Sequence, residues 1–277
     1  MMELKTTNPI AIGDKVRFQL QEKENVGVID HIYERTNYII RKATNLSKLS
    51  HIIAANLDQA IIIITLASPR TSTGFIDRFL VTAEAYHIPA RIIFNKIDLY
   101  DEESWVTHKQ IKDVYEKVGY PCNEISVKES INIDQVENLL KDKISLFAGH
   151  SGVGKSALIN KIESGLDIKT GIISDYHHKG KHTTTYAEMH ELSAGGFIVD
   201  TPGIKEFGLI DFKIEEVAER FPEMRKYMHD CKFNNCTHVH EPGCAVINAL
   251  KNKNISISRY ENYLNIINDD YFSKKQY

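Results

Sequence analysis

The residues Gly149-His150-Ser151-Gly152-Val153-Gly154-Lys155-Ser156 have the spacing G-x-x-x-x-G-K-S. In such a loop, glycines let backbone N–H groups surround a phosphate, the lysine reaches the β- and γ-phosphates, and the serine hydroxyl takes one Mg²⁺ position. The apolar run 144–148 predicts a strand before the loop, and Ala157 begins a predicted helix, 157–162, whose N-terminus adds partial positive charge. The sequence therefore predicts a P-loop that binds a nucleotide.

A second motif, Asn95-Lys96-Ile97-Asp98, follows an apolar run and predicts a base-binding loop at the carboxyl end of a strand. A carboxylate there accepts hydrogen bonds from N1–H and the exocyclic amine of guanine, whereas adenine offers an acceptor and no amine. An unpaired buried polar group costs about 1–3 kcal/mol, so the motif favours GTP over ATP. The stem of Lys96 is expected to lie along the base. Ser126-Val127-Lys128 is expected to bring backbone groups to the guanine O6.

Magnesium ligands are expected in two further segments. Asp200-Thr201-Pro202-Gly203 ends a predicted strand, so that Asp200 would hold Mg²⁺ through water and the Gly203 N–H would contact the γ-phosphate. The stretch 176–185 contains three threonines, and Thr184, with Thr183 as the alternative, is predicted to join Ser156 as a Mg²⁺ ligand when the γ-phosphate is present. His177 and His178 lie in the same stretch, and for them a solvated loop without a role in the site is as good an interpretation as a functional role.

A third constellation is predicted to bind zinc. Cys231, Cys236, His238 and Cys244 lie within fourteen residues, and three thiolates with one imidazole suit a closed, structural, tetrahedral Zn²⁺ site. His240 is a competing ligand. Clustered cysteines indicate a metal in a reducing compartment, not a disulfide framework, and Cys122 is interpreted as a buried thiol.

Composition excludes several classes of protein. The chain of 277 residues has 42% hydrophobic and 26% charged residues and a net charge of −3, which gives no overall basic signature. No apolar run approaches a membrane span, and residues 1–10 do not resemble a signal peptide. Contacts with RNA therefore depend on local basic residues: Arg41, Lys42, Lys48, Lys179 and Lys181. For the segment 41–48, a solvated linker is an equally good interpretation.

Hydrophobic patterning predicts an α/β protein with three domains. Residues 1–50 show short strands at 15–20, 27–33 and 38–41, typical of part of an OB-fold. Residues 51–211 alternate strands and helices, which predicts a mostly parallel sheet with helices on both faces. Residues 212–277 are helical and polar, with a short helix predicted at 214–221, and contain the cysteines. The predicted strands of the second domain are 60–66, 89–94, 124–127, 144–148, 187–192 and 196–199, and the predicted helices are 74–86, 102–118, 133–140 and 157–162.

The order of the motifs is unusual. In ordinary GTPases the P-loop comes first, the D-x-x-G aspartate next and N-K-x-D last. Here N-K-I-D comes first, and the P-loop, the threonines and D-T-P-G follow. The same sites assemble if the sheet is kept and the chain is opened at a different loop, which is a circular permutation. D-T-P-G then lies next to the zinc-binding segment.

These motifs, in this order and followed by the Cys-Cys-His-Cys pattern, resemble the ribosome small-subunit-dependent GTPase A family, also called the YjeQ family. The resemblance runs from about Ile10 to the C-terminal helices and includes Gly180-Lys181-His182-Thr183-Thr184-Thr185. It implies a permuted GTPase domain between an N-terminal OB domain, here partial, and a C-terminal zinc-binding helical domain. It also implies GTP hydrolysis in late maturation of the small ribosomal subunit, rRNA binding, one structural Zn²⁺, Mg²⁺ with GTP, and a cytoplasmic monomer without membrane contact.

The resemblance also suggests the groups that act on GTP. Ile204 stands after Gly203, where Ras-like proteins have the glutamine that positions water, so slow intrinsic hydrolysis is expected. His182 matches the family's candidate for orienting that water, alongside Lys155 and Thr184. Two alternatives remain: a nucleotide-gated RNA-binding adaptor with negligible hydrolysis, and a P-loop ATPase with a zinc-binding tail, which Asn95 and Asp98 disfavour.

Overall fold

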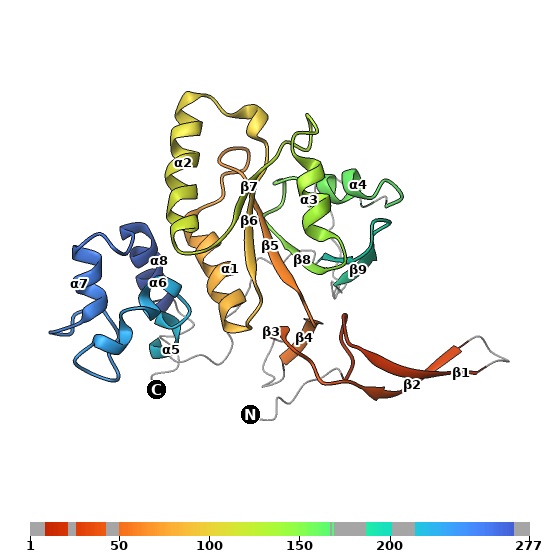
Figure 1. Ribbon diagram of the computed structural model, residues 1–277, viewed down its shortest axis with the longest axis horizontal. Coiled ribbons are helices and arrows are strands. Elements are labelled where there is room, and N and C mark those ends of the chain that lie inside the picture. The colour runs from red at the N-terminus through yellow and green to blue at the C-terminus, as the bar shows by residue number, and fades with distance from the viewer. Residues whose placement is uncertain are drawn as a thin grey trace, which may run out of the picture.

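A computed structural model describes residues 9–21, 26–42, 50–166, 168, 187–200 and 214–268 (Figure 1). The predicted threonine segment, with His182, Thr183 and Thr184, lies outside these residues, as do Lys48, Lys179, Lys181 and the residues after Asp200 in D-T-P-G. Asp200 itself ends a described strand.

The N-terminal strands form two antiparallel pairs. β1 (Val16–Gln21) pairs with β2 (Val26–Ile32), and β3 (Tyr38–Lys42) pairs with β4 (Ser50–Ala55). In the described residues these are two separate two-stranded sheets, and β1 and β2 extend away from the rest of the chain with most of their side chains exposed (Figure 1). β1, β2 and β3 confirm the three strands predicted for this part of the chain. β4 was not predicted. It follows the basic segment for which a linker and an RNA contact were alternative interpretations.

A six-stranded sheet forms the centre of the molecule. Its order is β7-β6-β5-β8-β10-β9, and every neighbouring pair is parallel except β10 with β9 at one edge. The strand that precedes the P-loop, β8, therefore lies inside the sheet between β5 and β10. The strands are β5 (Gln59–Ile64), β6 (Ala90–Phe94), β7 (Cys122–Glu124), β8 (Ile144–Ala148), β9 (Glu188–Glu191) and β10 (Phe197–Asp200).

Helices cover both faces of this sheet. α1 (Thr73–Ala85) and α2 (Glu102–Lys117) lie on one face, and α3 (Ile133–Leu140) and α4 (Lys155–Ile162) lie on the other (Figure 1). All six residues of β5 are buried, because successive side chains point to opposite faces and both faces are covered. The α/β architecture with helices on both faces is confirmed.

The C-terminal part of the chain is a group of short helices packed beside α1 (Figure 1). α8 (Ile257–Ile267) contacts α1, and a separate apolar core joins α8 to the other helices. The others are α5 (Ile214–Ala218), α6 (Pro222–Arg225) and α7 (Ala245–Lys251), with 3₁₀ turns at Met228–Asp230 here and at Ile97–Leu99 in the central domain.

Two predicted elements differ from the structure. The strand expected at 124–127 lies at Cys122–Glu124, and Ser126 instead forms an isolated bridge with Ile131. The helix expected from Ile214 to Phe221 ends at Ala218, and Phe221 becomes the N-cap of α6. Pro222 explains the break, since a proline disfavours helical backbone in the residue before it, and Phe221 is extended at φ −103° and ψ 104°.

Candidate functional site

Four strands end at one edge of the sheet, and the predicted nucleotide motifs follow these ends. N-K-I-D follows β6, Ser126 comes shortly after β7, the P-loop follows β8, and Asp200 ends β10. Parallel strands bring their carboxyl ends to the same edge, which is where ligands bind in open α/β sheets. We call this edge the nucleotide edge.

Asn95 joins the three nearest motifs. Its side chain is buried, with 1% exposed, and its Nδ2 donates a hydrogen bond of 2.8 Å to the Val153 carbonyl in the P-loop. Its Oδ1 accepts from the backbone N–H of Lys96 at 2.8 Å and of Val127 at 3.2 Å. One amide therefore ties the predicted base-binding loop to the P-loop and to the segment after β7.

Lys96 lies across the P-loop. Its Nζ donates to the carbonyls of Gly152 at 2.8 Å and Ser68 at 2.5 Å, so its stem runs from N-K-I-D to the P-loop. Lys96 has a positive φ of 65°. The contact with Ser68 was not predicted, since no pattern in the sequence marks that loop.

Asp98, the predicted guanine reader, is held by Ser126. The Ser126 hydroxyl donates to Asp98 Oδ1 at 2.5 Å and accepts from the Glu129 N–H at 3.1 Å, and Ser126 is fully buried. One carboxylate oxygen is thereby oriented by the segment that the sequence assigned to the base pocket. The structure places Asp98, Ser126 and Asn95 together.

The P-loop glycines adopt backbone conformations that would be strained for any other residue. Gly149, Gly152 and Gly154 have φ of 151°, 85° and 97°. A Cβ on Gly154 would lie 2.3 Å from Asn95 Nδ2, and one on Gly149 would lie 2.5 Å from the Ile63 carbonyl oxygen. The glycines are thus required both by backbone conformation and by close approach.

Lys155 begins α4 and forms an ion pair with Asp200 at the end of β10. Both side chains are largely buried, with 15% and 9% exposed. The predicted phosphate-binding lysine and the predicted magnesium-linked aspartate are therefore in contact. A loop that binds phosphate at the start of a helix also places backbone N–H groups and the helix dipole at that point.

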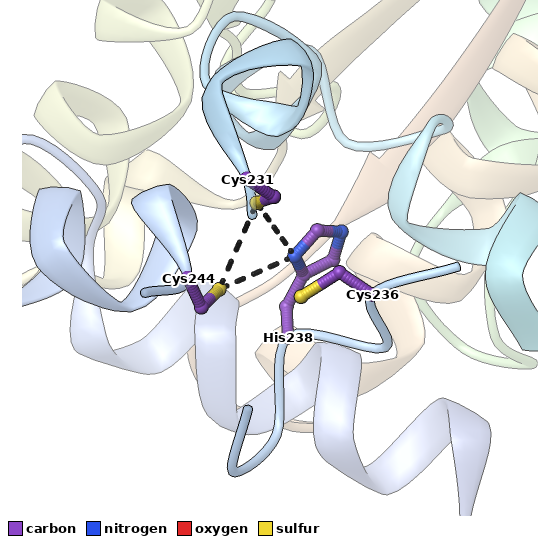
Figure 2. Close-up of side chains that lie close together, drawn as sticks. All are labelled: Cys231, Cys236, His238 and Cys244. Atoms are coloured by element: carbon purple, nitrogen blue, oxygen red, sulfur yellow. Dashed lines mark hydrogen bonds between the residues drawn. The ribbon is translucent and has the colours of Figure 1, made fainter. Parts of the chain in front are cut away.

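The four predicted zinc ligands converge in the C-terminal part of the chain (Figure 2). Their ligand atoms all lie within 4.8 Å of one another. Cys231 Sγ is 3.6 Å from His238 Nδ1 and 3.9 Å from Cys244 Sγ, and His238 Nδ1 is 3.4 Å from Cys244 Sγ. Tetrahedral zinc with bonds near 2.3 Å places its ligands about 3.5–3.8 Å apart, so these distances fit. We call these residues the Cys/His cluster.

Burial shifts the pKa values of this cluster toward its uncharged forms. Burial raises the pKa of the Cys236 thiol to about 12 and also raises the pKa of the Cys244 thiol, while it lowers the pKa of His238. Thiolates in such a place need a positive charge beside them, whereas a neutral imidazole is already the form that binds a metal. The competing candidate, His240, is exposed and lies outside the group.

Hydrogen bonds fix the loop that carries His238. The Glu241 carboxylate accepts from the backbone N–H of Thr237 at 2.6 Å, Val239 at 2.9 Å and His240 at 3.1 Å. Tyr260 on α8 donates to the His238 carbonyl at 2.7 Å. The loop is therefore oriented both from within and from α8.

The comparisons with known proteins agree with this geometry. Residues 32–210 match the model of the RsgA GTPase family. A protein of Bacteroides thetaiotaomicron named small ribosomal subunit biogenesis GTPase RsgA 2 is 51% identical over 96% of this chain and 86% of its own length. The RsgA of Christiangramia forsetii is 50% identical over 99% of this chain and 88% of its own length.

Solved structures show the same fold. YjeQ from Thermotoga maritima aligns with a TM-score of 0.77 and 36% identity, over 93% of this chain and 83% of that one. YloQ, described as a circularly permuted GTPase, aligns with a TM-score of 0.76 and 26% identity, over all of this chain and 86% of that one. The protein is a circularly permuted GTPase by fold. It belongs to the RsgA GTPase family.

Within the described ranges, no helix is both long enough and apolar enough to cross a membrane.

Proposed function

We propose that this protein hydrolyses GTP to GDP and phosphate and acts in maturation of the small ribosomal subunit. The observation that carries the GTPase assignment is the link between Asn95 and the Val153 carbonyl, since it joins a guanine-binding motif to a phosphate-binding motif at one edge. The names of the relatives, small ribosomal subunit biogenesis GTPases, support the biological setting.

In this proposal, each described motif binds one part of GTP. Asp98 accepts hydrogen bonds from the guanine, while Lys96 lies along the base and Ser126 orients the carboxylate. The P-loop backbone surrounds the phosphates, and Lys155 leaves Asp200 to meet the β- and γ-phosphates. The complete set of residues proposed to contact GTP is Asn95, Lys96, Ile97, Asp98, Ser126, Val127, Lys128, Gly149 to Ala157 and Gly203.

Magnesium fits the donors at the start of α4. Ser156 offers a hydroxyl and Asp200 a carboxylate, both oxygen ligands of the kind that Mg²⁺ prefers, and Thr184 or Thr183 would complete the set. When bound with GTP, Mg²⁺ neutralises charge that develops on the phosphates. Ser156 follows Lys155 in the first turn of α4, so the hydroxyl and the lysine would meet the same phosphates.

His182 is proposed to orient the attacking water, because Ile204 has no group that can do so. Single-turnover GTP hydrolysis on small ribosomal subunits, measured for wild type and His182→Ala, tests this assignment. We expect the variant to be slower by about 10²-fold or more, the range of a lost general-base or water-positioning group. Equal rates would remove His182 from the mechanism.

The Cys/His cluster is proposed to hold one structural Zn²⁺. Three thiolates and one imidazole fill a tetrahedral shell and leave no open position, so the metal would stabilise the C-terminal helices and take no part in hydrolysis. Metal analysis of the purified protein should give about one zinc per chain.

The proposed partners are the small ribosomal subunit and its rRNA, bound by a monomer in the cytoplasm, where thiols remain reduced. Arg41, Lys42, Lys48, Lys179 and Lys181 are the proposed RNA contacts. Co-sedimentation with small subunits should depend on whether GDP or a non-hydrolysable GTP analogue is bound. Equal co-sedimentation in both states would contradict a nucleotide-dependent switch.

Ile204 also supports a second candidate, an adaptor that binds nucleotide without hydrolysing it. Steady-state GTP turnover with and without small subunits separates the two functions. For the GTPase, turnover should rise when small subunits are added and should be lost in Lys155→Ala. Lys161→Ala, an exposed lysine on the same helix, is the matched control and should keep turnover.

A further inference from the structure

Helix α1 contacts the P-loop through an aromatic stack. The rings of Phe75 and His150 lie with their centroids 3.8 Å apart and their planes at 27°. His150 belongs to the first turn of the P-loop, because its carbonyl accepts from the Val153 N–H at 3.4 Å. Phe75 therefore rests against the segment whose backbone must hold its shape around phosphates, although it lies outside every nucleotide motif.

The other side of α1 is tied to the C-terminal helices by a buried carboxylate. Asp77 is fully buried and accepts three hydrogen bonds: from Arg259 Nη1 at 2.6 Å, from Asn262 Nδ2 at 2.6 Å and from the Tyr115 hydroxyl at 2.8 Å. Arg259 and Asn262 come from α8, and Tyr115 comes from α2. Removing a partner from such a buried charge is costly, so this contact fixes where α1 lies.

Phe75 and Asp77 face different ways on one helix. Two residues along an α-helix turn the side-chain direction by about 200°, so the same turn of α1 presents a ring to the P-loop and a carboxylate to α8. One turn of α1 therefore connects the contact with α8 to the contact with the P-loop.

α8 carries this connection on to the Cys/His cluster. Next to Arg259, the Tyr260 hydroxyl donates to the His238 carbonyl, and the Tyr263 hydroxyl donates to the Thr237 carbonyl at 2.5 Å. Arg259 is itself fixed by two hydrogen bonds to Glu223, of 2.7 and 3.0 Å, and by the Phe221 ring 4.7 Å away. Contacts therefore run without a break from the loop that carries His238, through α8, to the turn of α1 that holds Phe75 against the P-loop.

We propose that Phe75 is a positioning residue for the P-loop, and that Asp77 and Arg259 make nucleotide affinity depend on how the C-terminal helices pack against α1. The proposal rests on the nucleotide site proposed above. It adds a connection that runs through α1 and does not require the segment after Asp200. By linkage, nucleotide binding must stabilise the packing of α8 on α1 by the same factor.

Titration with a fluorescent GDP analogue in the presence of Mg²⁺ tests the role of Phe75. Phe75→Leu, which keeps apolar bulk but removes the stack, should weaken GDP binding about three- to tenfold, the range of one aromatic pair. Phe75→Tyr, which keeps a ring, should bind GDP as tightly as wild type. A merely structural role for Phe75 would lower the thermal midpoint of Phe75→Leu and leave its GDP affinity unchanged.

A double-mutant cycle tests the connection to α8. Asp77→Asn alone should weaken GDP binding about threefold, the size of a partly lost charge-assisted hydrogen bond, and should add no further loss to Phe75→Leu. Tyr115→Phe, which removes one donor to Asp77, provides a milder variant should Asp77→Asn fail to fold. Tyr120→Phe is the matched control, because its hydroxyl is bonded to Glu84 and not to Asp77.

The outcomes separate the two proposals. If wild type does not bind GDP, the proposed function is wrong. If wild type binds GDP and Phe75→Leu binds it equally well, the positioning role is wrong. If the effects of Phe75→Leu and of the Asp77 or Tyr115 variant simply multiply, Phe75 does not transmit the contact with α8, and that part of the proposal is overturned.

Discussion

The nucleotide edge and the Cys/His cluster are assembled in opposite ways. Contacts at the nucleotide edge join residues far apart in the chain, since Asn95 and Val153 are 58 positions apart and Lys155 and Asp200 are 45 positions apart. The cluster draws its ligands from one loop region, in which Cys231 and Cys244 are 13 positions apart. The first site is held by a sheet and its hydrogen bonds, and the second brings together three thiols and an imidazole that could hold a metal ion.

Different interactions are therefore expected to maintain the two sites. Polar groups at the nucleotide edge satisfy one another, as Asn95 does with three backbone partners. In the cluster, burial raises the pKa of Cys236 and Cys244, so the protein alone disfavours the ionised form that binds metal. Stability of the cluster should therefore depend on metal, while the nucleotide edge should depend on packing and glycine geometry.

Metal removal should produce the largest effect. Cys236→Ser, or treatment with a chelator, should cost several kcal/mol of the stability of the C-terminal helices, because structural zinc contributes about 10–16 kcal/mol of apparent binding energy in small zinc domains. Thermal unfolding followed together with zinc content measures this. The accompanying loss of free energy of GDP binding should be much smaller than this loss of stability.

Cys122→Ser is the control for metal removal. Cys122 lies in β7, outside the cluster, and should retain full zinc content. If Cys236→Ser kept both its zinc and its thermal midpoint, the Cys/His cluster would not be a metal site.

Asp98→Asn should produce the next largest effect, and it changes specificity. The amide can no longer accept from both N1–H and the exocyclic amine of guanine, so GTP affinity should fall about 10- to 100-fold, as for 1–3 kcal/mol of unpaired polar groups. Xanthine has an oxygen where guanine has the amine, so the same variant should gain affinity for XTP. Competition binding with GTP, XTP and ATP measures the change.

Asp101→Asn serves as the control for Asp98→Asn. Asp101 caps α2 three residues further on, and asparagine caps helices equally well, so guanine preference should be kept. A wild-type protein that preferred ATP, or an Asp98→Asn variant with unchanged preference, would contradict the base assignment.

Gly154→Ala should weaken nucleotide binding by about tenfold or more, because its Cβ would lie 2.3 Å from Asn95 Nδ2 and would displace the link to Val153. Gly119→Ala is a matched control, since Gly119 also has a positive φ, of 105°, but a Cβ there meets nothing within 4 Å. That variant should pay only the backbone penalty of about 1–2 kcal/mol in stability. Its GDP affinity should equal that of wild type, and equal losses in both variants would contradict the assigned role of Gly154.

Glu241→Gln should have the smallest effect. It should lower only the stability of the Cys/His cluster and its loop. Burial opposes ionisation of Glu241, but hydrogen bonds from Thr237 and other backbone groups lower its pKa to about 2. Since this folded pKa lies below the ordinary value of 4.5, the stabilisation is complete above about pH 4.5 and is lost only as the pH falls toward 2. Replacement with an amide should cost about 1–2 kcal/mol.

The thermal midpoint of Glu241→Gln should therefore lie below that of wild type by the same amount at pH 6.5 and at pH 8. A difference that changed between these two pH values would mean that Glu241 titrates there and is not held by these bonds. Unchanged GDP affinity is expected at both values.

Residue types and spacing along the chain were enough to predict the chemistry of both sites. Glycines, Lys155 and Ser156 at fixed spacing specify a phosphate loop wherever a strand and a helix flank them, and the four cluster ligands were found from spacing alone. The strands and helices that flank these motifs were predicted because their apolar residues repeat with the period of the element. The order of motifs likewise revealed the permutation, since order is a property of the chain.

Which segments of the chain come into contact could be read only from the folded structure. Nothing in periodicity placed β4 beside β3, put β8 between β5 and β10, or brought Asp77 to Arg259 across 182 positions. Phe75 carries no signal in the sequence, since an aromatic residue on a helix is ordinary core material. Its contact with His150 arises because α1 is packed between the P-loop and α8, and such packing is set by many long-range contacts at once.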